Sequence, residues 1–171
     1  MGSPPRPAFV LDADFPQGIV QQLLMEWTPA LDLVGWQAVM PTTHAVSDEQ
    51  VIVNAWQRGY QGVISCNHSM LDVPETLAVI RQTKMSVVTC RTKTNKVQMA
   101  TGALLLNLGY IASSYLPNKP QIWELNYPLK PPLPFNDRVK RVEVQTGESL
   151  ASFEWTGELL AKPVFPDLPP A

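Results

Sequence analysis

Two aspartates stand directly after a short apolar run near the start of the chain. The run is Phe9–Leu11, Asp12 and Asp14 follow it, and Pro16 then opens a helix-like pattern. Ligands of an open α/β sheet bind outside the carboxyl ends of its strands, and carboxylate oxygens suit Mg²⁺ or Mn²⁺. The stretch therefore predicts a metal site, with a helix cap formed by Asp14 as the alternative.

Further polar residues follow a second apolar run, Gly62–Ser65. The loop after it contains Asn67, His68 and Ser69, and Asp72 comes a little later. His68 is a candidate general base or phosphate contact. The alternative is a hydrogen-bonded surface histidine.

Basic residues gather in the middle of the chain. The net charge is only −2, but residues 1–80 hold eight acidic and two basic residues, whereas residues 81–141 hold ten basic and two acidic ones. Arg91, Lys93 and Lys96 precede an expected helix, whose N-terminus favours a phosphate. An acidic pocket beside a basic surface suits a metal-dependent enzyme that acts on a phosphate backbone. Solvated charged faces are the alternative.

The elements that must position these residues alternate along the chain. Strands are expected at Phe9–Leu11, Trp36–Met40, Gly62–Ser65, Met85–Cys90 and Gln121–Leu125. Helices are expected around residues 19–27, from the capping-box pattern Ser47-Asp48-Glu49-Gln50 to Gly59, at Pro74–Gln82, and from Thr94 or Asn95 to about Leu108. This alternation predicts an α/β fold with a parallel sheet.

A change of composition divides the chain. Residues 8–126 form the expected domain, and residues 127–171 form a proline-rich C-terminal extension. Within the extension, Val139–Gln145 alternates like an edge strand, and Ala151–Leu160 is a short helix or a disordered arm. We expect the extension to pack on the domain or on a second copy of the chain.

Composition excludes several classes of protein. No run among the 171 residues reaches the roughly 20 apolar residues of a membrane span, so a soluble, cytoplasmic protein without a membrane partner is predicted. Cys66 and Cys90 are too few for a disulfide scaffold and are expected as buried, reduced thiols. The five tryptophans and the extension favour a homodimer. The sequence contains neither a glycine-rich phosphate loop nor a nucleophile elbow.

In the order of these motifs the chain resembles the PIN-like superfamily, in particular its compact VapC-type toxin branch. Leu11–Pro16 is similar to the family's Leu-Leu-Asp-Glu-Asn-Leu-Pro, and Ser47–Gln50 to its Ser-Asp-Glu-Glu helix start. The resemblance covers about residues 9–126. It implies a three-layer sandwich with a parallel five-stranded sheet in the order 3-2-1-4-5. In active members it also implies RNA cleavage by Mg²⁺ or Mn²⁺.

The family's site carries over in part. Asp12 matches the acid after the first strand, Asp14 matches a polar position, and Asp48 or Glu49 matches the acid that begins the second helix. Relatives have Thr-x-Asp-x-Asp-Phe where this chain has Ser-Cys-Asn-His-Ser-Met, so Asn67 and Ser69 replace two aspartates. The loss of two negative charges weakens a site for a hard dication.

Two hypotheses follow. The first is a metal-dependent endoribonuclease, as in the toxin of a toxin–antitoxin pair, whose partners are RNA and an antitoxin protein. Its metal ligands come from Asp12, Asp14, Asp48, Glu49, Asn67 and Asp72, and Glu49 and His68 count among its catalytic residues. Its RNA contacts are Asn67, Ser69, Arg91, Lys93 and Lys96. The second is a catalytically impaired PIN-like domain that binds RNA or protein.

A phosphatase of the haloacid dehalogenase type is a further hypothesis, which the strand-Asp-x-Asp pattern suggests. That family expects a threonine or valine where Pro16 stands. The sequence therefore argues against this hypothesis.

Overall fold

Five parallel strands form the centre of the protein. The structure, a computed structural model, describes residues 6–15, 31–40, 46–90, 97–125 and 134–164. The strands are β1 (Ala8–Leu11), β2 (Asp32–Gly35), β3 (Gly62–Ser65), β4 (Ser86–Cys90) and β5 (Gln121–Leu125). The helices are α2 (Asp48–Gln57), α3 (Pro74–Thr83), α4 (Val97–Ser114), α5 (Phe135–Thr146) and α6 (Gly157–Ala161), with 3₁₀ turns η1 (Trp36–Ala38), η2 (His68–Asp72) and η3 (Leu150–Phe153).

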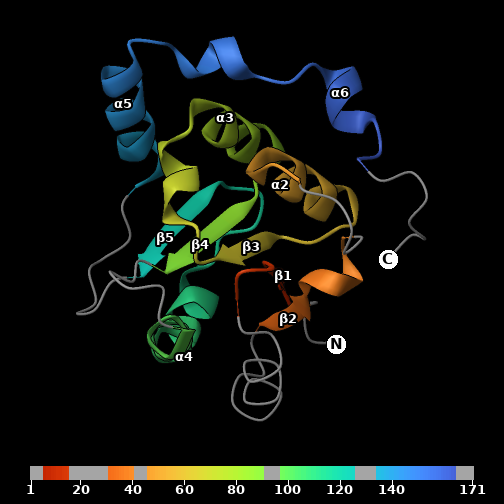
Figure 1. Cartoon of the computed structure of the whole chain (residues 1–171), viewed down its shortest axis with the longest axis vertical. Helices are drawn as coiled ribbons and strands as arrows, with labels where there is room; N and C mark the ends of the chain where they lie inside the picture. Colours follow the sequence, from red (N-terminus) through yellow and green to blue (C-terminus); the bar gives the residue numbers. More distant parts are fainter. Residues whose placement is uncertain (1–5, 16–30, 41–45, 91–96, 126–133, 165–171) are drawn as a thin grey trace.

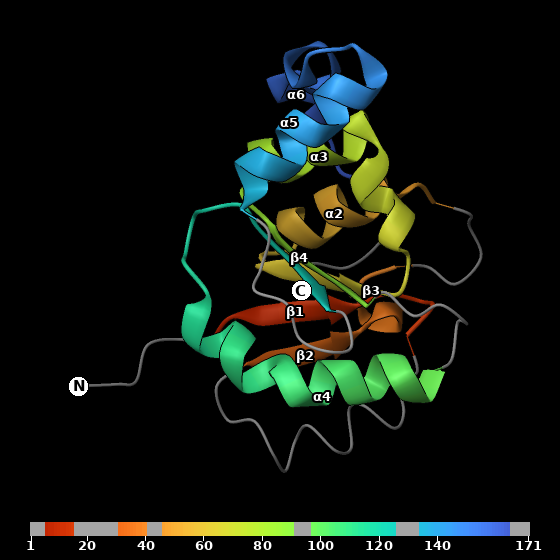
Figure 2. The same cartoon turned by 90° about the vertical axis from the view of Figure 1, so that its left-hand side faces the viewer.

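Helices cover both faces of the sheet. α2 and α3 lie on one face, with α5 and α6 above them, and α4 lies along the other face (Figures 1 and 2). Successive strand residues point to opposite faces, so Val10 packs on the α2 side while Phe9 and Leu11 pack on the α4 side. The expected α/β class, with three layers and an all-parallel five-stranded sheet, is confirmed.

The strand order is β2-β1-β3-β4-β5, which differs from the order 3-2-1-4-5 that the resemblance implies. β1 has β2 and β3 as its neighbours, because Phe9 is in register with Leu33 on one side and Gly62 on the other. A Cβ atom on Gly62 would stand 2.6 Å from the Phe9 ring, so this pairing requires glycine. β2 is added on one side of β1, and β3, β4 and β5 are added on the other side, so the strand order reverses between β1 and β3.

The second strand lies earlier in the chain than expected. A strand was predicted at Trp36–Met40, but β2 is Asp32–Gly35 and the chain then turns through η1. Trp36, Val39 and Met40 are all buried, and their spacing is that of a helical turn rather than of alternation. The prediction was wrong because a tight apolar turn was read as a strand.

The predicted start and end of α2 are confirmed. The Ser47 hydroxyl accepts a hydrogen bond from the Gln50 N–H, and the Gln50 side chain accepts one from the Ser47 N–H, which together make a capping box. At the other end Gly59 adopts a φ of 82°, which favours glycine. The expected helix around residues 19–27 lies outside the described residues.

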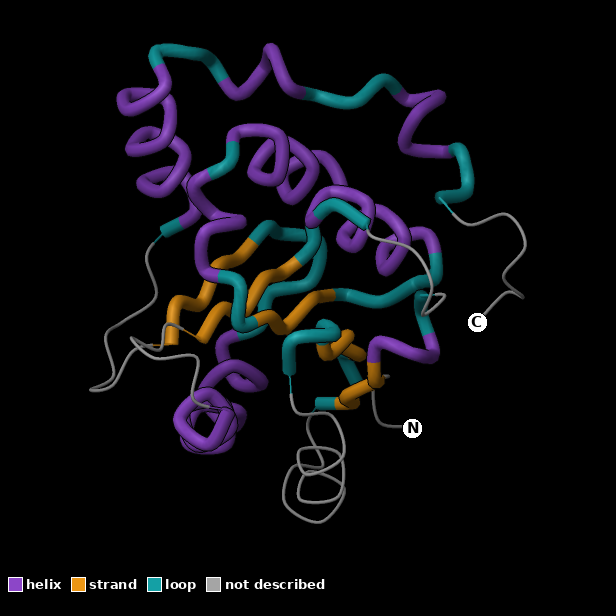
Figure 3. Tube along the Cα trace, viewed as in Figure 1, coloured by secondary structure: helices purple, strands orange, loops and turns teal. Residues whose placement is uncertain are grey.

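The C-terminal extension packs on the domain, and the predicted strand at Val139–Gln145 is wrong. These residues belong to helix α5 (Figure 3), because Val139 and Val142 share a helix face that joins the core cluster containing α3. Further along, the Gln82 side chain pairs with both the N–H and the carbonyl of Trp155. Among the described residues, no helix is both long and apolar enough to cross a membrane.

Candidate functional site

The observed strand order brings together the carboxyl ends of β1 and β3. Asp12 and Asp14 follow β1, and Ser65, Cys66 and Asn67 end β3, with the Asp12 N–H donating to the Ile64 carbonyl at 2.9 Å. A reversal of strand order between two such neighbours opens a crevice that commonly binds ligands. The two polar loops that the sequence singled out therefore meet where an α/β sheet normally places its site.

Asp12 carries a carboxyl group whose ionisation is unfavourable. Burial, reinforced by the negative charges of Asp14 and Asp48, raises the pKa of Asp12 to about 6. Hydrogen bonds from the Ser65 side chain and the Ala13 N–H act in the opposite direction. Near neutral pH this carboxylate thus exists as a poorly solvated anion beside two others, an arrangement that favours a bound cation.

Asp14 ties the end of β1 to the loop after β3. One of its carboxylate oxygens accepts a hydrogen bond from the Cys66 N–H at 3.1 Å, and the other accepts one from the Ser65 hydroxyl at 3.4 Å. Partial burial raises the pKa of Asp14, whereas these hydrogen bonds lower it. The alternative role as a cap at Pro16 lies outside the described residues.

Asn67 links the third acid to the same loop. Its side-chain amide donates to both carboxylate oxygens of Asp48, at 3.0 and 3.3 Å, and its carbonyl oxygen accepts from the Ser69 hydroxyl at 2.6 Å. An aspartate at position 67 would repel Asp48, whereas the amide neutralises part of its charge by hydrogen bonding. We call Asp12, Asp14 and Asp48 the acid cluster.

Glu49 and Asp72 have partners on other elements. The Glu49 carboxylate accepts a hydrogen bond from the Thr76 hydroxyl on α3. The Asp72 carboxylate pairs with Arg138 on α5. Both acids were predicted as metal ligands, but these contacts tie them to the helical layer above the sheet.

His68 belongs to a second set of polar side chains, at the ends of β4 and β5. Its Nδ1 lies 3.3 Å from the Thr89 hydroxyl and its Nε2 lies 3.7 Å from Glu124, whose carboxylate is in turn 3.3 Å from Arg138. The His68 side chain is 17% exposed, so it is partly buried and is held by these contacts. We call His68, Thr89, Glu124 and Arg138 the histidine cluster.

The sequence interpretation missed Glu124 and Arg138. Glu124 was visible as a lone acid in an otherwise apolar strand, which is a signal for a buried charge with a partner. Arg138 had no usable signal, because its segment was predicted to be a strand. The guanidinium is 3% exposed and also donates to the Leu71 carbonyl at 2.9 Å.

The acid cluster does not by itself form a complete metal site. The described residues include no group of three or more His, Cys, Asp and Glu side chains that could hold a metal ion. Mg²⁺ is commonly held by only one or two carboxylates, with water and substrate phosphate as its other ligands. Asp12 and Asp14 offer such a pair of oxygen donors.

The thiols are unsuited to chemistry at neutral pH. Cys66 and Cys90 are both free, as predicted, but Cys66 is only partly buried. Burial and the neighbouring charges of Asp14 and Asp12 raise the pKa of Cys66 to about 12, and burial also raises the pKa of Cys90. A thiolate nucleophile is therefore disfavoured at this edge of the sheet.

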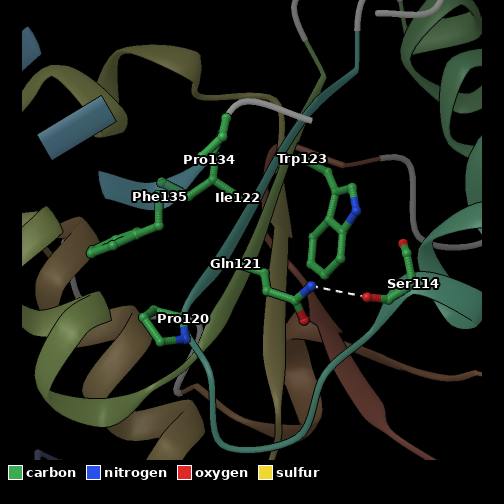
Figure 4. A pocket seen from close by; sticks show the side chains of 7 residues that line it. All are labelled: Ser114, Pro120, Gln121, Ile122, Trp123, Pro134 and Phe135. Carbon is green, nitrogen blue, oxygen red and sulfur yellow. Dashed lines mark hydrogen bonds between the residues drawn. The ribbon is translucent and has the colours of Figure 1, made fainter. Parts of the chain in front are cut away.

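A pocket of about 200 Å³ lies at the start of β5, which is an edge strand of the sheet. Its walls are mainly apolar, from Pro120, Ile122, Trp123 and Phe135, and the Gln121 side chain donates to the Ser114 carbonyl at 2.9 Å (Figure 4). The acid cluster follows the carboxyl ends of β1 and β3, so this pocket is not part of the candidate site.

The phosphate contacts predicted at Arg91, Lys93 and Lys96 lie outside the described residues. The acid cluster and the histidine cluster are therefore the groups on which a function can be argued. No protein-family model, curated protein or solved structure matches this chain.

Proposed function

We propose that this protein is an endoribonuclease that cleaves RNA phosphodiesters with Mg²⁺ or Mn²⁺, as the toxin of a toxin–antitoxin pair does. The observation that carries the proposal is the meeting of Asp12 and Asp14 with the loop after β3 at the switch point of the sheet, where burial also raises the pKa of Asp12 to about 6. A group that is held in an unfavourable charge state at a crevice is a marker of a functional site.

Each residue of the site has a distinct role in this proposal. Asp12 and Asp14 would hold the cation, and the negative charge of Asp48 would add to its attraction. Asn67 and Ser69 orient the substrate, and Arg91, Lys93 and Lys96 bind the RNA backbone. A bound dication supplies an activated water and neutralises charge that develops on the phosphate. His68, between Thr89 and Glu124, would contact the substrate or act as a general base.

A second candidate function is binding of RNA or protein without catalysis. The observation in its favour is the amide of Asn67, which already occupies both carboxylate oxygens of Asp48. In this case the hydrogen bond holds the loop after β3 in place without a metal. The RNA-binding surface would be retained and the chemistry lost.

The test compares the wild-type chain with Asp12→Asn and Asp32→Asn on single-stranded RNA. Asp32 is a matched control, because it carries the same group at the amino end of edge strand β2, where its side chain is 56% exposed. We expect Mn²⁺-dependent RNA cleavage by the wild type and by Asp32→Asn. Asp12→Asn should cleave RNA no faster than wild-type protein treated with EDTA.

Two other outcomes separate the hypotheses. Cleavage that Asp12→Asn leaves unchanged would remove the acid cluster from the mechanism. RNA binding that EDTA does not alter, with no cleavage at any Mn²⁺ concentration, would support the binding domain instead.

A further inference from the structure

Helix α4 carries no charged residue along its whole length. Its 18 residues, Val97–Ser114, include no Asp, Glu, Lys, Arg or His, although the helix forms an outer layer of the molecule (Figure 2). One face is accounted for, because Ala100, Leu104, Leu108 and Ile111 are buried against the sheet. A surface helix ordinarily presents charged residues on its opposite face.

That opposite face exposes large apolar side chains. Leu106 is 68% exposed, and Met99 and Tyr110 are each 49% exposed. Their spacing places them on one side of the helix. We call this side the outer face of α4; its residues are Met99, Gly102, Leu106, Gly109, Tyr110 and Ser113. Clustered exposed apolar side chains of this kind mark an interaction surface.

Two glycines on the outer face have no explanation within the described chain. A Cβ atom on Gly102 or Gly109 would meet no atom within 4 Å, and neither residue has a positive φ. Glycine destabilises a helix relative to alanine, so these positions weaken α4 without serving its own packing. A close approach by another chain explains them, because glycine lets two backbones come near.

We propose that the outer face of α4 binds a second copy of this chain, with the two helices antiparallel about a two-fold axis at Leu106. In this register Leu106 meets the partner's Leu106, Gly102 meets the partner's Tyr110, and Met99 meets the partner's Ser113. Each large side chain thus faces a small one, or itself at the axis. A two-fold axis normally brings like charges together, and the uncharged face avoids that repulsion.

The size of the surface sets the strength of the dimer. An 18-residue helix is about 27 Å long and roughly 10 Å wide, so the outer faces alone bury only several hundred Å². Stable complexes bury about 1,200 Å² or more. The dimer therefore dissociates readily and forms as the concentration rises. The interface is independent of the acid cluster, so its failure would not affect the proposed nuclease.

The test is sedimentation of the full chain from low micromolar to several hundred micromolar concentration. We expect the wild type to dimerise as it is concentrated and Leu106→Glu to associate at least about tenfold more weakly. Val144→Glu is the matched control, since Val144 is 84% exposed on α5, and it should behave as wild type. Because Leu106 is exposed, circular dichroism should show Leu106→Glu folded.

Two further arms test the symmetry and the glycines. Leu106→Lys should be monomeric alone but should form a heterodimer when mixed with Leu106→Glu, because residue 106 meets itself. Gly102→Leu should raise the melting temperature of the dilute protein, through better helix propensity, and yet weaken association by filling the space of the partner's Tyr110.

Three results would overturn the proposal. The first is a wild type that stays monomeric at the highest concentration. This result would overturn the proposal even if the outer face bound a lipid vesicle or another segment of the chain. The second is a Leu106→Glu protein that dimerises as tightly as the wild type. The third is a mixture of the Glu and Lys variants that remains monomeric.

Discussion

Asp12 is a residue whose charge opposes folding. In the folded protein its pKa is about 6, against an ordinary value of 3.8, so the folded state holds on to a proton that the unfolded chain releases earlier. Binding of this proton stabilises the folded state relative to the ionised form. The stabilisation is fully present below pH 3.8 and is lost as the pH rises through 6. At neutral pH the ionised group destabilises the protein by up to about 3 kcal/mol.

The first prediction concerns the melting temperature. Asp12→Asn should melt above the wild type at pH 7.5, and this difference should shrink as the pH falls from 6 towards 3, where Asp12 is protonated in both states. Mn²⁺ should raise the melting temperature of the wild type at pH 7.5, because a cation favours the ionised carboxyl group. It should have little effect at pH 4.5 or on Asp12→Asn.

Thermal unfolding by differential scanning fluorimetry measures these shifts, with Asp32→Asn as the control for the loss of a carboxylate elsewhere. A lower melting temperature of Asp12→Asn at pH 7.5 would show that the carboxylate stabilises the fold, contrary to this account. A Mn²⁺ shift that persists in Asp12→Asn would place the ion at another site.

The bounds of four strands could be predicted from the sequence, whereas β2 and α5 could not. β1, β3, β4 and β5 were predicted at or within a residue of their observed bounds, because short apolar runs between turn residues carry a strong local signal. β2 and α5 were mistaken, since a buried 3₁₀ turn and a half-polar helix give ambiguous patterns over so few residues. Local periodicity does not distinguish them without knowledge of the packing partners.

In the candidate site, too, local features could be predicted from the sequence and long-range contacts could not. The position of Asp12 and Asp14 after β1 is a local property and was predictable. The contact of Asn67 with Asp48, and of His68 with Glu124, depends on which strands are neighbours. Strand order is a long-range property, and the order expected from the resemblance was not the one observed.

The second prediction concerns α5, which Arg138 joins to the sheet. The Arg138 guanidinium is 3% exposed and lies between Glu124 and Asp72. Arg138→Met removes the cation beside the 13% exposed Glu124 carboxylate, so we expect a loss of about 3 kcal/mol in the free energy of unfolding.

Urea unfolding measures this loss. Arg141→Met is the control, because Arg141 is an exposed arginine on the same helix, and it should change stability by less than about 0.5 kcal/mol. Equal effects of the two substitutions would mean that the ion pair with Glu124 contributes nothing specific.

At the scale of the whole molecule, the C-terminal extension is part of the domain and not an appendage. Val139, Val142 and Leu150 belong to the same core as residues of β1, α2 and α3. The Gln57 side chain on α2 also donates to the carbonyls of Leu160 and Lys162, at 2.7 and 2.6 Å. The boundary predicted after residue 126 marks a change of composition, and described residues on both sides of it share this core.

The third prediction follows from this shared core. A chain that ends at residue 133 should expose the upper side of α3, lose cooperative unfolding and aggregate. A chain that ends at residue 164 retains every described contact and should unfold as the full chain does. Calorimetry of both proteins is the measurement, and a shorter chain with an intact, sharp transition would contradict the shared core.

The ion pair between Arg138 and Glu124 joins α5 to a strand that is synthesised before it. Residues of β1 to β5 leave the ribosome before α5 does, so a nascent chain has its sheet but lacks the guanidinium that lies beside Glu124. The histidine cluster can therefore form only after the residues of α5 have been synthesised.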